Sequence, residues 1–459
     1  MNVSIYLRTL FFRIGVALSV LPALSQQPPV VAPDSQIAAA LHQVSSEQIR
    51  ATIEKLVSFQ TRSTLSAQDP ASIAAGHGIG AAREWIKSQF EAYSRDCGGC
   101  LAVKTDAFTQ STVERIPTPT QITNVYATLM GSNQESAKRI VLVTGHYDSR
   151  NSDVLDTSGA APGANDDASG AAVSLECARV LSKLKFPATI IFLTVAGEEQ
   201  GLNGSSHFAK MAKSEGWDIE AVLNNDIVGG DRSPQQDSGA VRVFSEGLPA
   251  AATEAERRLI RSLGGESDSS SRQLARYVAE VGRTYASPVK PVLVFRLDRY
   301  GRGGDHSSFN QQGYAAVRFT EFRENFDHQH QNLRTENRIE FGDLPKFVNY
   351  DYVADVARLN LATLASLALA PAPPANVRIA LKKPDNASTL VWESSPGGRA
   401  EGYELVWRST ASPDWEHVQA LGNVTQYTSP LSKDNEIFAI RAVDKAGHRS
   451  LAVVPSPEQ

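Results

Sequence analysis

Cysteine is scarce in this 459-residue sequence, which contains only Cys97, Cys100 and Cys177. A zinc knuckle needs two cysteine pairs, so the sequence excludes that class of metal site. The short spacing between Cys97 and Cys100 is compatible with a small disulfide in an oxidising compartment. Cys177 falls on the apolar side of a helical segment, and we expect it to be a buried core thiol.

The sequence also lacks a long basic run, and beyond its N-terminus it has no apolar stretch of membrane-spanning length. The net charge is −5 and the isoelectric point is near 6.0. Proteins that bind nucleic acid or anionic membranes usually carry a surplus of positive charge. We therefore expect no nucleic-acid partner and no membrane span in the mature chain.

The first 25 residues are typical of a secretory signal. Arg8 and Arg13 precede the apolar run IGVALSVLPALS, which is too short to span a bilayer. Ala23 and Ser25 form an A-x-S pattern that suits signal peptidase. We expect residues 1–25 to be removed and the protein to be secreted or periplasmic. A membrane anchor is the alternative, which Arg13 disfavours because it interrupts the apolar stretch.

The length predicts two domains, and the pattern of apolar residues separates them. Apolar, β-prone runs at residues 140–144, 188–196 and 220–229 alternate with amphipathic helical segments. Such continuous apolar strands are typical of a sheet that is buried on both faces. The alternation predicts an α/β domain over residues 45–370, with a central, mostly parallel but mixed sheet and helices on both faces. Residues 26–44 are proline-rich at their start and are expected to form a linker or extension.

A different pattern follows the proline-rich linker at residues 371–375. Short apolar strands recur every 8–12 residues or so over residues 376–455, which predicts a small all-β sandwich. This segment resembles a fibronectin type III domain, whose strand settings are occupied here by Trp392, Tyr403 and Trp407. Phe438 stands where that family usually has tyrosine, so the tyrosine-corner hydrogen bond should be absent. The sandwich contains no cluster of titratable residues.

Side chains of the metal-ligand type follow the apolar strands of the first domain. They are His146, Asp148, Asp166, Asp167, Glu198, Glu199, Asp226 and a histidine of the segment NFDHQHQN. In an open α/β sheet, ligands bind at the carboxyl ends of the strands. A mixture of imidazole and carboxylate groups suits zinc better than calcium or magnesium, which prefer oxygen ligands. Each pair alone is common, but the ordered set indicates a metal site.

The motifs GHYD, GANDDASG, AGEEQG and NND resemble those of the secreted peptidases with two co-catalytic zinc ions, over roughly residues 45–369. That family includes bacterial leucyl aminopeptidases, glutamate carboxypeptidase II and glutaminyl cyclases. The resemblance implies that His146 and Asp226 hold one zinc ion. Glu199 and the late histidine would hold the other, and Asp166 would bridge the two. In that family the peptide bond after the bridging aspartate is cis.

The resemblance also implies catalytic roles. Glu198 would be the general base, and Asp148 would hydrogen-bond the second ring nitrogen of His146 and so fix its tautomer. His330 is preferred to His328 as the late metal ligand, because it lies nearer the following polar turn. The other histidine would then contact the substrate or a ligand.

Four further polar residues are expected to have other roles. Asp167 is interpreted as structural. Asp305 and His306 resemble a structural pair of the same family, with contact to substrate as the alternative. His207 follows Gly204 on a helix and is expected to be a solvated or packing residue.

The leading hypothesis is an aminopeptidase that acts on peptides and anchors their free amine with carboxylates near the metals. A carboxypeptidase or dipeptidase would need a basic pocket, for which Arg296, Arg299 and Arg302 are candidates. A single-zinc glutaminyl cyclase and a non-catalytic binding protein are further alternatives. The C-terminal sandwich would bind an unidentified surface or protein.

Overall fold

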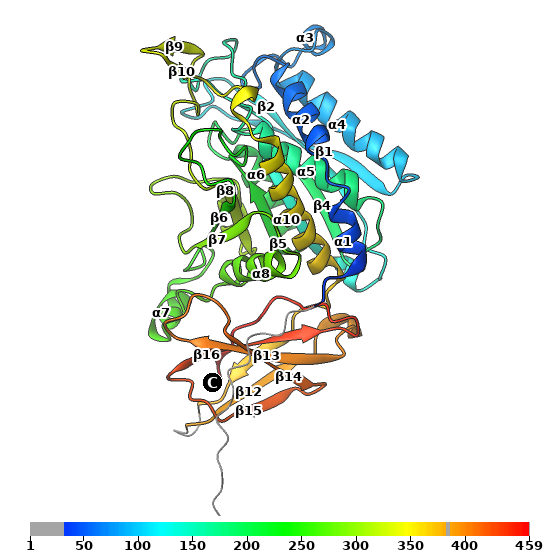
Figure 1. Cartoon of the computed structure of the whole chain (residues 1–459), viewed down its shortest axis with the longest axis vertical. Helices are drawn as coiled ribbons and strands as arrows, with labels where there is room; N and C mark the ends of the chain where they lie inside the picture. Colours follow the sequence, from blue (N-terminus) through cyan, green and yellow to red (C-terminus); the bar gives the residue numbers. More distant parts are fainter. Residues whose placement is uncertain (1–31, 382–385, 459) are drawn as a thin grey trace, which may run out of the picture.

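The computed structural model describes residues 32–381 and 386–458. The expected signal sequence, residues 1–25, lies outside these residues. An α/β domain forms one end of the molecule and a small β domain forms the other (Figure 1).

The α/β domain is organised around an eight-stranded mixed sheet with the order β1-β2-β4-β3-β5-β8-β6-β7. The strands are β1 (Leu101–Gln110), β2 (Thr120–Leu129), β3 (Arg139–His146), β4 (Thr189–Val195), β5 (Asp218–Asn225), β6 (Ala240–Ser245), β7 (Lys290–Val294) and β8 (Ala316–Glu321). The pairs β3–β4, β3–β5, β5–β8 and β6–β7 are parallel, and the other three are antiparallel. The sequence-based expectation of a mixed sheet is confirmed.

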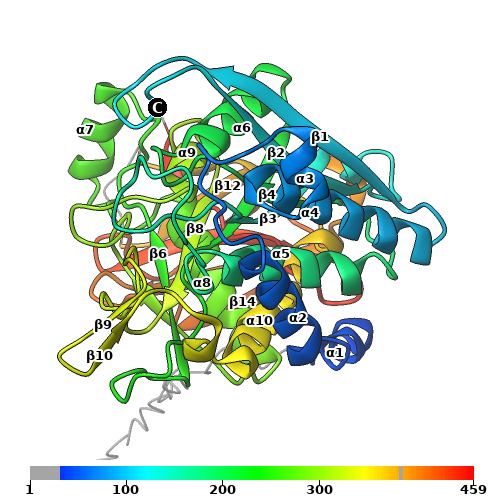
Figure 2. The ribbon, with the colours of Figure 1, turned by 90° about the horizontal axis from the view of Figure 1, so that it is seen from above.

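Helices cover both faces of this sheet (Figure 2). They are α1 (Ser35–Leu41), α2 (Ser46–Val57), α3 (Pro70–Ala74), α4 (Gly78–Asp96), α5 (Ala168–Leu181), α6 (Asn203–Ser214), α7 (Glu254–Ser262), α8 (Ser270–Thr284), α9 (His306–Asn310) and α10 (Tyr350–Leu369). Side chains alternate along a strand, so Val141 and Val143 of β3 enter the larger core with α2, α5 and α10. Leu142 enters the opposite core with α6 and α9.

Two helices refine what the sequence suggested. Part of the segment expected as a linker or extension forms α1, which Asp34 caps and whose Ile37 is fully buried. Among the described residues, α10 is the one helix long and apolar enough to cross a membrane. Most of α10 is buried between the sheet and its neighbours, as expected of a core helix.

The C-terminal domain consists of two small sheets, as predicted. Its strands are β11 (Ala375–Ile379), β12 (Ser388–Glu393), β13 (Gly402–Ser409), β14 (His417–Gly422), β15 (Gln426–Ser429), β16 (Glu436–Val443) and β17 (Ser456–Pro457), arranged as β15-β12-β11-β17 and β14-β13-β16. Trp392 packs edge-on against Tyr403 in the core, and Phe438 is buried there. The relation to fibronectin type III domains stays a prediction.

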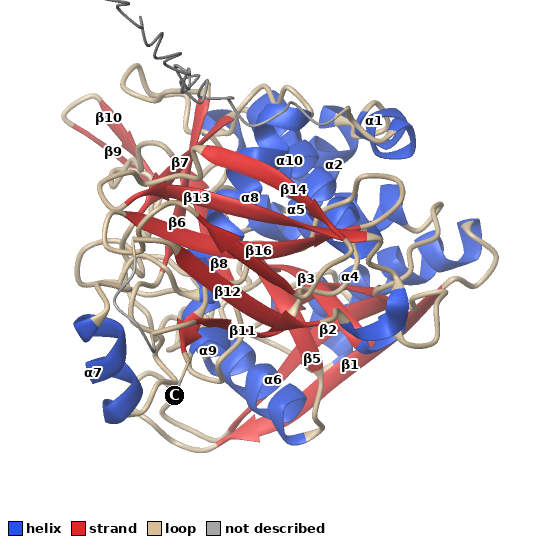
Figure 3. Cartoon of the chain, turned by 90° about the horizontal axis from the view of Figure 1, so that it is seen from below, coloured by secondary structure: helices blue, strands red, loops and turns tan. Residues whose placement is uncertain are grey.

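The β domain is firmly joined to the α/β domain, and its strands lie across the lower end of that domain (Figure 3). Pro371, Ala372 and Pro374 of the linker are buried. Asp268 Oδ1 accepts a hydrogen bond from Arg408 of β13 at 2.7 Å, and Arg276 of α8 lies 3.3 Å from the same atom. The junction is therefore a packed interface with buried ion pairs.

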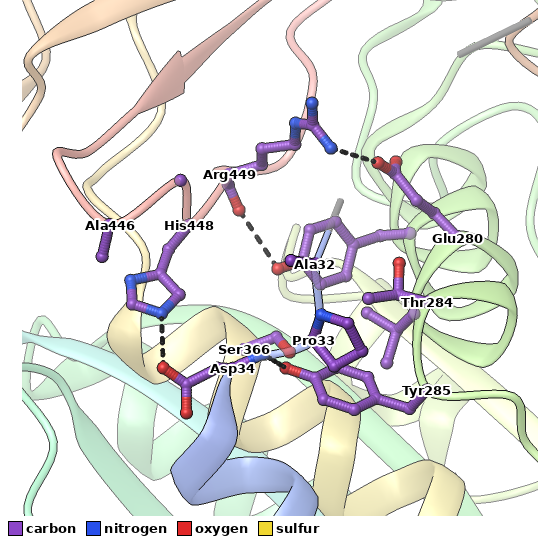
Figure 4. A pocket seen from close by; sticks show the side chains of 13 residues that line it. Ala32, Pro33, Asp34, Glu280, Thr284, Tyr285, Ser366, Ala446, His448 and Arg449 are labelled. Carbon is purple, nitrogen blue, oxygen red and sulfur yellow. Dashed lines mark hydrogen bonds and ion pairs between the residues drawn. The ribbon is translucent and has the colours of Figure 1, made fainter. Parts of the chain in front are cut away.

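A second part of the junction surrounds a cavity of about 200 Å³. Arg449 is directed at Glu280, and His448 is directed at Asp34 (Figure 4). The other ring nitrogen of His448 lies 2.9 Å from Asp444. The first described residues of the chain thus contact its last domain.

Candidate metal centre

The ligand-type residues predicted from the sequence converge at one edge of the central sheet. His146 is the last residue of β3, and Asp226 directly follows β5. Glu198 and Glu199 lie in the loop after β4, and Asp166 lies just before α5. Because β3, β4 and β5 are parallel neighbours, their carboxyl ends bring these side chains together.

Two groups of possible metal ligands share one aspartate. His146 Nε2 lies 3.1 Å from Asp166 Oδ1 and 4.0 Å from Asp226 Oδ1. On the other side, His330 Nε2 lies 2.9 Å from Asp166 Oδ2 and 3.0 Å from Glu199 Oε1. The two oxygens of Asp166 therefore face different groups, which is the arrangement expected of a bridging carboxylate.

The environment of His146 fits a metal ion at Nε2. Nδ1 lies 3.1 Å from the Asp148 carbonyl oxygen and 3.4 Å from its carboxylate. A proton on Nδ1 is stabilised there, which leaves the lone pair of Nε2 free. Nε2 is buried and has no hydrogen-bond partner of good geometry among the described residues. The combined imidazole and carboxylate donors of the two groups suit zinc.

Asp148 and Asp167 hold the strand ends in position. The carboxylate of Asp148 accepts hydrogen bonds from Thr64 Oγ1 and the Glu199 amide. The carboxylate of Asp167 caps α5 through Gly170 and also accepts from the backbone amide of His146. The expected structural role of Asp167 agrees with these contacts, and the bond between it and Asp166 is cis, as the resemblance implied.

Glu198 lies on the cavity wall but belongs to neither ligand group. Burial raises the pKa of its carboxyl group well above the usual range; the charge of His146 opposes this rise, and the nearby Asp226, Glu199 and Asp305 add to it. Because Glu198 lies close to the ligand groups but belongs to neither, its carboxylate is available for proton transfer.

His330 and His328 have different surroundings. His330 joins the second ligand group and has a left-handed backbone conformation, with φ of 54°. His328 pairs with Asp231 and stacks on Phe347 with ring centroids 3.6 Å apart. The structure thus places the preferred histidine at the site and gives the other one a packing role.

Two further histidines considered above, His306 and His207, are packed against the rest of the domain. His306 Nε2 donates to the Leu297 carbonyl at 2.8 Å, and the ring is wholly buried, in agreement with a structural role. His207 Nδ1 lies 3.0 Å from Asp106, and its ring stacks on Phe108.

Cys97 and Cys100 form the disulfide considered above, and Cys177 is buried.

A cavity of about 380 Å³ opens onto the two ligand groups. Of the arginines considered for a basic pocket, Arg299 and Arg302 line it, whereas Arg296 lies over the ring of Tyr300. Arg115 and Arg150 also line the cavity and were not predicted. Both arginines lie in loops, and no pattern in the sequence predicts where these loops lie in the fold.

Three further residues support the site without having been predicted. The buried Arg318 places Nη2 2.8 Å from Asp226 Oδ1. Gln329 donates to Asp166 Oδ2, and the Asp343 carboxylate accepts the backbone amide of Asp166. One signal was available for Arg318: a charged residue within the buried strand AVRFTE requires a partner.

The profile of Peptidase family M28 matches residues 124–347. The chain is 47% identical to a "Probable zinc metalloprotease" of Pyrenophora tritici-repentis, over 93% of this chain and 88% of that protein. The chain belongs to peptidase family M28. A second relative of the same name, from Pyricularia oryzae, is 46% identical over 93% of this M28 chain and 85% of its own length.

Solved structures support the fold of this M28 chain. The Legionella pneumophila LapA aminopeptidase is similar with a TM-score of 0.51 and 21% identity, covering 75% of this chain and 78% of LapA. At that identity the similarity concerns the fold. Membership in a family of zinc metallopeptidases confirms the coarser part of the expected function, a zinc-dependent hydrolase.

Proposed function

We propose that this M28 protein is a secreted exopeptidase with two zinc ions per chain, and specifically an aminopeptidase. One observation carries the proposal: two three-residue ligand groups share Asp166, and Glu198 stands beside them on the wall of the same cavity. Secretion is supported by the disulfide between Cys97 and Cys100, since disulfides persist mainly in oxidising compartments.

The side chains of the site have separate roles. His146 and Asp226 would hold one zinc ion, Glu199 and His330 the other, and Asp166 would bridge them. Zinc in these positions supplies Lewis-acid polarisation of the scissile carbonyl and a nucleophile at neutral pH.

Glu198 is the residue that transfers the proton. Its carboxylate takes a proton from the attacking water and later delivers that proton to the leaving amine. Asp148 holds His146 in the tautomer that presents Nε2.

The carboxylates of the cavity support the assignment as an aminopeptidase. Glu198, Glu199 and Asp166 line the wall and can receive the free amine of a peptide. A complete second ligand group also favours two metals over the single zinc of a glutaminyl cyclase.

A carboxypeptidase or dipeptidase is the second candidate, because arginines line the same cavity. Assays of the zinc-loaded protein on amino-acid anilides and on N-blocked peptides with a free C-terminus separate the two functions. We expect hydrolysis of the anilides and loss of that hydrolysis on chelation. Activity on the blocked peptides alone would contradict the aminopeptidase assignment.

A further inference from the structure

Four arginines line the catalytic cavity, and two of them form ion pairs with carboxylates of the protein. Arg299 is paired with Asp298 at 3.0 Å and with Glu324 at 2.8 Å. Arg302 lies 3.3 Å from the same Glu324. Both arginines thus have carboxylate partners within the protein, although Glu324 also pairs with Arg242.

The other two arginines have no such partner. Arg115, in the loop between β1 and β2, donates from Nη1 to the Glu199 carbonyl at 3.2 Å. Arg150, four residues after β3 ends, donates to the carbonyls of Asn151 and Ser152. Within the described parts of the chain, no carboxylate lies within 4.0 Å of either guanidinium group. Each retains N–H donors for a further acceptor.

The carboxylates on the cavity wall do not compensate these charges. Under the proposed function, Asp166, Glu199 and Asp226 are committed to the metal-ligand groups, and the wall carboxylates, Glu198 among them, serve proton transfer and the free amine of the substrate. The contact of Arg115 with the Glu199 carbonyl also places its guanidinium beside the ligand groups. Two uncompensated cations therefore face the place where the substrate must lie.

We propose that Arg115 and Arg150 bind a carboxylate of the substrate. Guanidinium groups bind carboxylates through strong, charge-assisted hydrogen bonds. The carboxylate belongs either to an acidic side chain next to the scissile bond or to the free C-terminus of a dipeptide. This inference rests on the proposed function and adds the class of substrate.

Two pairs of matched peptides test it with the zinc-loaded, full-length protein. Glu-Ala-amide against Gln-Ala-amide isolates an acidic side chain, and Ala-Ala against Ala-Ala-amide isolates a C-terminal carboxylate. We expect a kcat/KM about tenfold higher for the carboxylate member of at least one pair, mainly through a lower KM. The preference should weaken at high ionic strength, because Arg115 is exposed.

The double variant Arg115→Gln/Arg150→Gln should bring that ratio close to one, and Arg150→Glu should favour Lys-Ala-amide over Glu-Ala-amide. Zinc content and the thermal unfolding midpoint verify folding. Arg258→Gln, an exposed arginine of α7 outside the cavity wall, is the matched control and should keep the preference. Equal rates within both pairs, or a preference retained in the double variant, would overturn the inference while hydrolysis of neutral peptides upholds the proposed function. Hydrolysis of none of the peptides would overturn both.

Discussion

His330 Nε2 lies 2.9 Å from Asp166 Oδ2, whereas the ring of His328, only two residues earlier, pairs with Asp231. In an extended chain the two rings would point in the same direction. Residues 326–330 instead form a turn that ends in the left-handed His330, so the two rings have different surroundings. Backbone geometry therefore decides which of the two histidines joins the ligand group.

The first prediction compares these histidines. His330→Ala should remove about one zinc ion per chain and lower kcat/KM at least about 100-fold, since a direct ligand is lost. His328→Ala should retain the zinc content of the natural protein. Elemental analysis and peptide hydrolysis provide the two measurements. Equal zinc loss in both variants would argue against the assignment of His330.

The second prediction concerns Glu198. Glu198→Gln preserves the size of the side chain but removes its ability to accept a proton. We expect kcat to fall by roughly 10²–10⁴-fold, the usual range for general acid–base catalysis. Zinc content and the thermal unfolding midpoint should stay near those of the natural protein. Turnover at the natural rate would show that another group accepts the proton.

The third prediction concerns the junction between the domains. Asp268→Ala leaves the buried guanidinium groups of Arg276 and Arg408 without their shared carboxylate. We expect the free energy of unfolding to fall by about 3–5 kcal/mol, as when one partner of a buried ion pair is removed.

Urea denaturation measures this change. Asp414→Ala is the matched control, because it removes a more exposed pair with Arg283 and should cost less than about 1 kcal/mol. Similar losses of unfolding free energy in both variants would show that burial of the Asp268 ion pairs does not determine how much they contribute to stability.

The fourth prediction concerns pH. The hydrogen bond that His448 donates to the Asp444 carboxylate raises the pKa of His448 above its ordinary value of 6.5, burial opposes this, and Asp34 adds to the rise. The folded state therefore favours the protonated ring. The resulting stability is fully present below the unfolded pKa and is lost as the pH rises through the folded pKa.

Unfolding in urea at pH values of about 5.5 and 8.5 tests this. The natural protein should lose more stability between these two values than His448→Gln, by an amount on the order of 1 kcal/mol or less. An identical pH dependence in the two proteins would exclude His448 as its source.

The sequence predicted the catalytic edge of the sheet because local and global signals coincide there. Continuous apolar runs marked β3, β4 and β5, and polar residues followed each run directly. Neighbouring parallel strands end at one edge, so position along the chain was enough to bring these residues together. The short helix α1 gave no comparable signal, since seven residues span only about two turns.

The residues that support the site could not be predicted from their position along the chain. Gln329 and Asp343 act through contacts with Asp166, which is more than 160 residues away in the chain. Arg115 and Arg150 occupy loops whose course depends on the packing of the whole domain. Their roles arise from tertiary proximity, which neither periodicity nor spacing encodes.

The β domain and the cavity lie at opposite ends of strand β3. Arg139, at the start of β3, and Arg399 of the β domain both donate to the Ala370 carbonyl. His146 lies at the other end of β3, roughly 23 Å along the strand. The β domain therefore sits at the far side from the mouth of the cavity. A chain tethered to a solid support through its β domain would leave peptides free to enter and leave.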